Sequence, residues 1–382
     1  MRNILLLPMF LTLLAFTQGC SSSTHTTPAP GSWAIAIHGG AGVLEKVAPP
    51  AERAEYANAL AAALQIGRDE LARGGTALDA VQKVVAALEE DPHFNAGKGA
   101  VFTYDGTHEL DASIMDGPTL KCGAVAGVKT VKSPIGLARL VMDKSPHVLL
   151  MGEGAEQFAT KMNVQRVDNT YFDTAKRRES WKERKQEIDA ESGMGLPAHV
   201  SGASPEANDS PSPLAFGNQD TRDEASRTRA SKPVPRKSTY GTVGAVALDS
   251  HGHLAAATST GGLTCKRWGR VGDTPVIGAG NYADTYAAIS CTGTGEEFIR
   301  HSVARQIALR VELTGCSAAQ AADAVVNHKL KPDDGGVIVV SNTGEIAMLY
   351  NSEGMFRGAA NSRGRFEVGI WHRMGNPQEV GK

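Results

Sequence analysis

A long polar segment near the middle of the chain is the strongest constraint on its fold. Residues 192–238 are crowded with Pro, Ser, Asn, Asp and Arg and contain few large apolar side chains. Such a segment cannot bury enough apolar surface to stay ordered. Regular apolar patterning lies on both sides of it and resumes sharply at Thr242. The sequence therefore predicts two patterned stretches of chain joined by a disordered linker.

The pattern before the linker predicts a mixture of strands and helices. Strand candidates cover residues 33–37, 109–115, 122–128 and 147–151. Helix candidates cover residues 51–72, 135–144, 152–162 and the highly charged stretch 175–191. A further helix opens at Thr76, with Asp79 three residues on as in a variant of the capping box.

The pattern after the linker is compact. It predicts strands over residues 242–248, 254–258, 336–341, 346–350 and 355–360, and helices over residues 296–313 and 318–328. This order of strands, helices and strands favours sheets stacked between helical layers over a simple βαβ repeat.

The chain begins with a segment typical of export signals. Arg2 precedes an apolar run over residues 4–16, which is too short to cross a bilayer as a stable helix. The run ends in TQGC, which resembles a bacterial lipoprotein box, although Thr17 stands where leucine is usual. We therefore expect a signal peptide over residues 1–19, a lipidated Cys20, a tether over residues 20–31 and a periplasmic, membrane-anchored protein. A plain signal peptide that is cut nearby is the alternative.

Composition argues against several classes of partner. The chain has 382 residues, 41% of them apolar, and its formal net charge of -2 gives no field that would hold nucleic acid. The eleven histidines form no H-E-x-x-H cluster, and no G-x-S-x-G elbow for a serine nucleophile is present. No C-x-x-C or zinc spacing links the remaining cysteines, which are Cys122, Cys265, Cys291 and Cys316. We interpret these four as buried free thiols, although an oxidising periplasm could pair two of them.

The Gly241-Thr242 bond has chemistry of its own. Gly241 lacks a β-carbon, so the peptide can take a strained conformation in which the Thr242 hydroxyl reaches the preceding carbonyl carbon. An N-to-O acyl shift and hydrolysis of the ester would then free the α-amine of Thr242. That amine has an ordinary pKa of about 7.7 to 8, which suits a general base. In isolation, however, a Gly-Thr pair at a strand start is far more often structural.

Several motifs, taken together and in order, resemble one enzyme family. They are HGGAG at 38–42, FNAGKGAVFT at 94–103, HELDASIMDG at 108–117, GTVGAVALD at 241–249, AAATSTGG at 255–262, GRVGDTPVIGAG at 269–280 and SCTGTGE at 290–296. They resemble the plant-type asparaginase and isoaspartyl peptidase family of N-terminal-nucleophile hydrolases, from residue 33 to residue 369 apart from the linker. The resemblance implies an α+β fold, a four-layer αββα sandwich. It also implies one inactive precursor that is cut into an α subunit, residues 32–241, and a β subunit, residues 242–382, with two such heterodimers associating.

The resemblance also implies roles around the cleavage site. Thr242 would cut its own chain after Gly241 and then act as the nucleophile toward substrate. Thr260 would hold or polarise the hydroxyl of Thr242. Asn95 would support the nucleophile from a loop of the α subunit.

Further roles concern the substrate. Arg270 would grip an α-carboxylate through paired hydrogen bonds, and Asp273 would hold an α-ammonium, so that together they recognise a free amino-acid head. Without the family context, the two would be interpreted as a solvated loop ion pair. The Thr292 hydroxyl and the Gly293 N–H would form an oxyanion hole.

The loop over residues 88–98 resembles one whose backbone carbonyls enclose a structural sodium ion. The matching carbonyls belong to Leu88, Glu89, Asp91, Phe94, Ala96 and Lys98. Oxygen-only ligation suits a hard cation and leaves no side-chain signature. No catalytic cofactor is expected.

The expected reaction releases L-aspartate from isoaspartyl dipeptides and from L-asparagine through a β-aspartyl enzyme on Thr242. Its substrate is a small molecule or dipeptide with a free aspartyl head, with no nucleic acid involved and a membrane contact only through the lipid anchor. A glycosylasparaginase is the first alternative, although that family usually has aspartate where Gly241 stands. A lipid-anchored amino-acid or peptide binding protein is the alternative from another class.

Overall fold

The computed structural model describes residues 31–42, 48–193, 241–371 and 374–375. The expected signal peptide, Cys20 and all of the tether but residue 31 lie outside the described residues, and so does the expected linker from residue 194 on. Within the described ranges, no helix is both long enough and apolar enough to cross a membrane.

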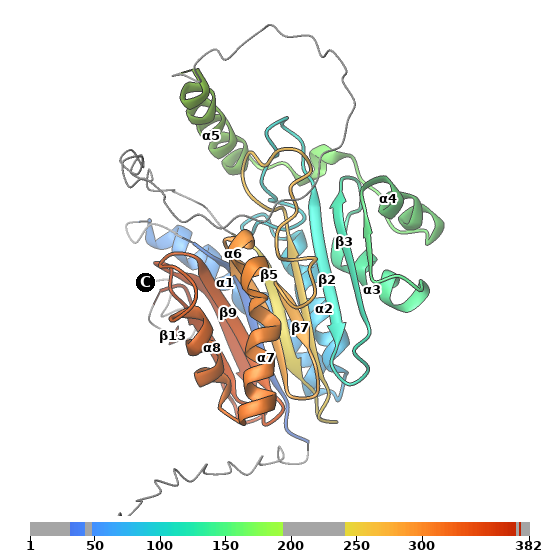
Figure 1. Ribbon diagram of the computed structural model, residues 1–382, viewed down its shortest axis with the longest axis vertical. Helices are drawn as coiled ribbons and strands as arrows, with labels where there is room; N and C mark the ends of the chain where they lie inside the picture. Colours follow the sequence, from blue (N-terminus) through green and yellow to red (C-terminus); the bar gives the residue numbers. More distant parts are fainter. Residues whose placement is uncertain (1–30, 43–47, 194–240, 372–373, 376–382) are drawn as a thin grey trace, which may run out of the picture.

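A nine-stranded sheet joins the two stretches of chain (Figure 1). In spatial order its strands are β13 (Met374–Gly375), β12 (Phe366–Gly369), β11 (Met355–Asn361), β1 (Ala34–Ala41), β5 (Val243–Leu248), β6 (Leu254–Thr260), β2 (Leu110–Asp116), β3 (Cys122–Val128) and β4 (Leu149–Met151). Neighbours are antiparallel except β3 and β4, which are parallel. Because β1 lies between β11 and β5, a strand from before the linker is hydrogen-bonded on both sides to strands from after it. The two stretches therefore form one folded unit.

A second, four-stranded sheet packs against the first. Its strands in spatial order are β10 (Ile346–Tyr350), β9 (Gly335–Ser341), β8 (Ala287–Gly293) and β7 (Asn281–Ala283). Side chains alternate across both sheets. In β1, Ile35 and Ile37 face the helices, whereas Ala34 and Ala36 join a core between the two sheets.

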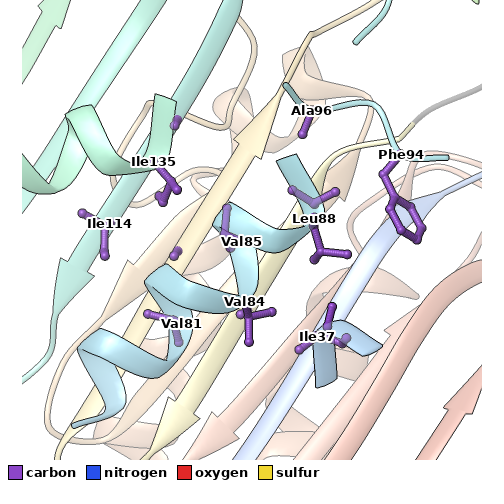
Figure 2. Close-up of a cluster of buried hydrophobic side chains, with 14 of the residues drawn as sticks. Ile37, Val81, Val84, Val85, Leu88, Phe94, Ala96, Ile114 and Ile135 are labelled. Carbon is purple, nitrogen blue, oxygen red and sulfur yellow. The ribbon is translucent and has the colours of Figure 1, made fainter. Parts of the chain in front are cut away.

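Helices cover the outer face of each sheet. Those against the larger sheet are α1 (Pro50–Ala72), α2 (Ala77–Glu90) and α3 (Pro134–Lys144), and those against the smaller are α7 (Val303–Thr314) and α8 (Ala318–Val326). Figure 2 shows Val81, Val84, Val85 and Leu88 of α2 among apolar side chains of the larger sheet and α3. The remaining helices are α4 (Gly152–Lys161), η1 (Asn169–Phe172), α5 (Ala175–Gly193) and α6 (Gly295–His301). The predicted α+β class is confirmed.

Most predicted elements form, and the differences have physical causes. The helix expected over 296–313 is two helices, because Ser302 takes a left-handed conformation with φ 46° between α6 and α7. The start expected at Thr76 is confirmed, since its hydroxyl accepts the Asp79 amide at 3.1 Å. The strands β7, β8, β12 and β13 were not predicted. In β8 all side chains but that of Ile289 are small and both faces are buried, so its sequence shows no alternation of apolar and polar residues.

The cysteine prediction is partly wrong. The four described cysteines are free thiols, and Cys265 and Cys291 are buried as expected. Cys122 and Cys316, however, are partly exposed. Cys122 begins β3, and Cys316 lies between α7 and α8, so both are at the ends of elements rather than in the core.

Candidate functional site

The two threonines proposed to react together face each other across β5 and β6. Val243 pairs with Ser259, so the antiparallel register places Thr242, one residue earlier, opposite Thr260. The hydroxyl of Thr242 donates to that of Thr260 at 3.2 Å. Both residues are buried, with 8% and 3% of their surface exposed. By strand alternation their side chains face the second sheet, on the same side as Val246 of β5.

Asn95 lies against the bond expected to be cut. A β-carbon on Gly241 would lie 2.8 Å from the β-carbon of Asn95, so this close approach requires glycine at position 241. The Asn95 amide is used by its own loop and by the turn after β6: Nδ2 donates to the Gly262 carbonyl at 2.8 Å, and Oδ1 accepts the Val101 amide at 2.9 Å. The Gly262 amide donates in turn to the Thr260 hydroxyl at 3.0 Å. Asn95 thus contacts Gly241 directly and reaches the two threonines through this turn.

His38 holds the backbone of Thr242. Its Nδ1 lies 3.0 Å from the Thr242 carbonyl oxygen, and its Nε2 lies 2.8 Å from the Ser290 hydroxyl. Because a carbonyl oxygen only accepts, Nδ1 carries the proton and Nε2 accepts from Ser290. Burial lowers the pKa of His38 to about 3, against the opposing effect of the hydrogen bond to Thr242, so the ring is neutral. A β-carbon on Gly244 would lie 2.4 Å from Nε2, which requires glycine there.

Asp273 is a buried carboxylate with an unpaired oxygen. It lies in the loop between β6 and β7, and its Oδ2 has no hydrogen-bond partner among the described residues. Added β-carbons on Gly280 and Gly295 would lie 2.7 and 2.9 Å from its carboxylate oxygens, so two glycines make room for it. Burial raises the pKa of Asp273 to about 7, although nearby Arg270 lowers it. A substrate ammonium is the kind of group that would satisfy this oxygen.

Arg270 pairs with a residue that the sequence prediction missed. Its Nε and Nη2 donate to the two carboxylate oxygens of Glu296, each at 2.9 Å. Burial raises the pKa of Glu296, but the hydrogen bonds from Arg270 outweigh burial and leave it lowered. The simple Arg270–Asp273 ion pair is not formed, since the ion partner of Arg270 in the described part of the chain is Glu296. The SCTGTGE motif, which ends in Glu296, was the available signal.

Two hydrogen-bond donors lie at the end of β8, which packs against β5. The Thr292 hydroxyl oxygen accepts the Ala41 amide at 3.0 Å, which leaves its proton free to donate elsewhere. Gly293 has φ 152°, and a β-carbon there would lie 1.9 Å from the Asp334 carbonyl oxygen. The Cys291 amide donates to the Gly280 carbonyl, on the side of β8 that faces away from β9. Because N–H groups two residues apart on a strand point to the same side, the Gly293 N–H also points away from β9.

The expected cation loop closes on itself through backbone hydrogen bonds. The Lys98 amide donates to the Glu89 carbonyl at 2.7 Å. A β-carbon on Gly99 would lie 2.6 and 2.8 Å from the carbonyl oxygens of Pro92 and Phe94. Two carbonyl oxygens thus lie close to one point beside Gly99, and of the six expected cation ligands Phe94 is one of these two. No group of three metal-binding His, Cys, Asp or Glu side chains occurs within the described residues.

The Glu89 side chain points away from this loop. Its buried carboxylate accepts the Ser133 and Ser259 hydroxyls and the Ile135 amide. Burial raises its pKa to about 7, although these hydrogen bonds lower it. Glu89 thereby ties the end of α2 to the start of α3 and to the residue before Thr260.

A cavity of about 460 Å³ lies beside the loop that carries Arg270. It is lined by residues that include Gly127, Met151, Glu156, Arg166 and Gly269. The two facing threonines and Asp273 do not line it. The candidate site is therefore the buried cluster at the ends of β5, β6 and β8, and this cavity is separate from it.

Comparison with known proteins covers both stretches of the chain. A family model described as Asparaginase matches residues 31–370. The probable isoaspartyl peptidase/L-asparaginase 2 of Arabidopsis thaliana is 44% identical over 342 residues, which are 89% of this chain and 99% of that protein. The isoaspartyl peptidase of Escherichia coli is 43% identical over 350 residues, 91% of this chain and 98% of that protein. A plant-type L-asparaginase of Pyrococcus furiosus is 40% identical, with coverage of 84% and 94%.

Replacing Asp273 by Asn tests its buried charge. The pKa of this acid is raised from 3.8 to about 7 in the folded protein, so the fold favours the protonated form and loses stability as the pH rises through that interval. The Asn variant lacks this loss. At pH 8 we expect the Asn variant to have a higher thermal unfolding midpoint than the wild type and a free energy of unfolding larger by on the order of 2–4 kcal/mol. Both differences should shrink toward pH 4. Exposed Asp105→Asn is the control, and a difference that does not change with pH would contradict the assignment.

Two isosteric changes test the role of His38. Asn at this position keeps a donor near Nδ1, whereas Gln places its amide near Nε2. We expect chain cleavage at Gly241-Thr242 to stay close to the wild-type rate in His38→Asn and to fall about tenfold in His38→Gln, because one hydrogen bond to the Thr242 carbonyl is lost. Intact mass against time measures the rate, and thermal unfolding checks that both variants fold. Equal rates in the two variants would show that the Nδ1 contact does not matter.

Proposed function

Because the chain belongs to the asparaginase family, we propose that it is a self-activating threonine amidohydrolase that releases L-aspartate from isoaspartyl dipeptides and L-asparagine. The observation that carries the proposal is the contact at 3.2 Å between the hydroxyls of Thr242 and Thr260. Thr242 is the residue directly after Gly241. A buried hydroxyl beside a second hydroxyl, on the residue directly before a strand, is the arrangement that an N-terminal threonine nucleophile needs.

The stacked layers support the finer assignment of the fold. Helices, the nine-stranded sheet, the four-stranded sheet and further helices enclose three apolar cores, as expected of the four-layer αββα sandwich of N-terminal-nucleophile hydrolases. The proposed α subunit, 32–241, and β subunit, 242–382, would stay together after cleavage, because β1 is paired with β5 and β11.

Self-cleavage would proceed through an ester. The Thr242 hydroxyl oxygen attacks the Gly241 carbonyl carbon, the C–N bond breaks, and the nitrogen takes up the proton that the hydroxyl gives up. Water then hydrolyses the ester, which leaves a carboxylate on Gly241 and restores the hydroxyl beside a free α-amine. Asn95 and His38 would hold the two sides of this bond, since Asn95 packs against Gly241 and His38 bonds the Thr242 carbonyl.

The freed α-amine of Thr242 would then act as the general base for turnover. The hydroxyl attacks the side-chain carbonyl of the aspartyl group, and the Thr292 hydroxyl and Gly293 N–H stabilise the oxyanion. The amine or ammonia leaves with a proton, and water releases L-aspartate from the enzyme. Asp273 would hold the substrate ammonium, and Arg270 its α-carboxylate, which a guanidinium already fixed by Glu296 can meet in a defined orientation.

The proposal extends to three further features of the protein. The carbonyls of the 88–98 loop would hold a sodium ion that stiffens the loop carrying Asn95. Two αβ heterodimers would associate. The apolar run before Cys20 would direct export to the periplasm, with the lipid on that cysteine as the membrane anchor.

The first test follows the intact mass of the purified protein with time, for the wild type, Thr242→Ser and Thr242→Val. We expect the wild type to give a fragment beginning at Thr242, the Ser variant to cleave because it keeps a hydroxyl, and the Val variant of equal shape to stay whole. The same spectra show whether the other fragment begins at a lipidated Cys20, and native spectra show the number of subunits.

Substrate comparison then separates the alternatives. We expect an isoaspartyl dipeptide and asparagine to be hydrolysed, and the same dipeptide with an acetylated amine to be poor, because its nitrogen cannot meet Asp273. Faster release from glycosylasparagine would favour a glycosylasparaginase. A wild-type chain that stays whole and binds amino acids without hydrolysis would favour the binding protein.

Sodium removal tests the cation loop. Replacing sodium by N-methyl-D-glucamine at equal ionic strength is expected to lower the thermal unfolding midpoint, because a bound ion stabilises the folded state by mass action. Readdition of sodium should restore the midpoint. Equal midpoints in the two salts, down to trace sodium, would mean that the loop holds no ion.

A further inference from the structure

The first turn of α5 presents an arginine to the cleavage site. Arg177 Nε donates to the Gly99 carbonyl at 2.8 Å, which fixes the guanidinium beside the loop of Asn95. A β-carbon placed on Gly241 would lie 3.7 Å from Arg177 Nη2. The guanidinium therefore adjoins Gly241 itself, from an element that none of the family motifs includes.

Arg177 differs from its neighbours on the helix in having no carboxylate partner within the part of the chain that the structure describes. Lys176 pairs with Glu52, and Arg178 pairs with Asp173. No carboxylate within the described ranges pairs with Arg177. Burial lowers its pKa, and the opposing contribution is that of Tyr56, which is not a carboxylate. Arg177 is partly buried, and a guanidinium in such a place with no carboxylate partner among the described residues gains stability when an anion comes beside it.

Cleavage would create an anion at that position. While the chain is intact, Gly241 carries a neutral peptide carbonyl. In the tetrahedral intermediate its oxygen is negative, and after hydrolysis of the ester it is part of an α-carboxylate. Resting on the self-cleavage proposed above, we propose that Arg177 is the counter-charge for Gly241: it stabilises the oxyanion of self-cleavage and then pairs with the new C-terminal carboxylate of the α subunit.

This role predicts opposite effects on the intact and cleaved protein. In the intact chain Arg177 is a partly buried charge with no carboxylate partner among the described residues, so replacing it by neutral Gln should leave stability equal or raise it. In the cleaved protein the same change removes an ion pair, so stability should fall. A side chain that only packs or caps would move both stabilities in the same direction.

The experiment compares Arg177→Gln, Arg177→Lys and, as a control one residue along, Arg178→Gln. Intact mass against time is expected to show self-cleavage at least tenfold slower in Arg177→Gln, partly restored in Arg177→Lys, and unchanged in Arg178→Gln. Thermal unfolding is then measured for Arg177→Gln in the uncut Thr242→Val background and in fully cleaved protein after long incubation.

The outcomes separate this inference from the proposed function. A wild-type chain that does not cut itself would overturn self-cleavage. If the wild type cuts itself and Arg177→Gln cuts at the same rate, only the role of Arg177 fails. A lower unfolding midpoint for Arg177→Gln in the uncut background would also overturn it, because a structural role would then account for slower cleavage.

Discussion

The pairing of β1 with β5 is the interaction on which the site depends. It is an antiparallel ladder between strands on the two sides of the linker, with Ala34 opposite Leu248 and His38 opposite Gly244. This register brings the His38 ring to the Thr242 carbonyl and requires a glycine where the ring passes. Because the ladder is made of backbone hydrogen bonds inside a nine-stranded sheet, a cut between the two strands would leave it in place.

The site combines groups that a fold optimised only for stability would avoid. Asp273 is buried with an oxygen that no described residue satisfies, and Arg177 is a partly buried cation without a described carboxylate partner. Each is unfavourable alone, and each would be relieved by one specific charge, the ammonium of the substrate or the carboxylate left by cleavage. The same electrostatic principle would thus operate at two stages. It would act first in self-cleavage and then in selecting a substrate with a free α-ammonium group.

Much of this architecture was predictable from local sequence. Long periodic elements such as α1 and α2, and the strands on both sides of the linker, follow from apolar spacing. The opposition of Thr242 and Thr260 follows from a hairpin whose turn is short. These features depend on residues that are close together along the chain.

The remainder depends on contacts between distant residues. His38 meets Thr242 across 204 positions, and local spacing carries no trace of that contact. Strand β8 was missed because its residues are mostly small and are buried on both faces, which leaves no alternation. The pairing of Arg270 with Glu296 was missed although Glu296 ends the SCTGTGE motif, because the motif does not show that its last side chain reaches back 26 positions to Arg270. The break at Ser302 was not predicted, because serine seldom takes a left-handed conformation and nothing in the local sequence marks it.

In the proposed mechanism, Thr242 carries the aspartyl group during turnover. The most direct measurement is rapid-quench mass spectrometry of the cleaved enzyme while it turns over an isoaspartyl dipeptide, followed by peptide mapping. We expect a transient mass increase of one aspartyl group on the fragment that begins at Thr242, located at that residue and lost as aspartate appears. Steady release of aspartate with no such adduct, or an adduct on another residue, would contradict it.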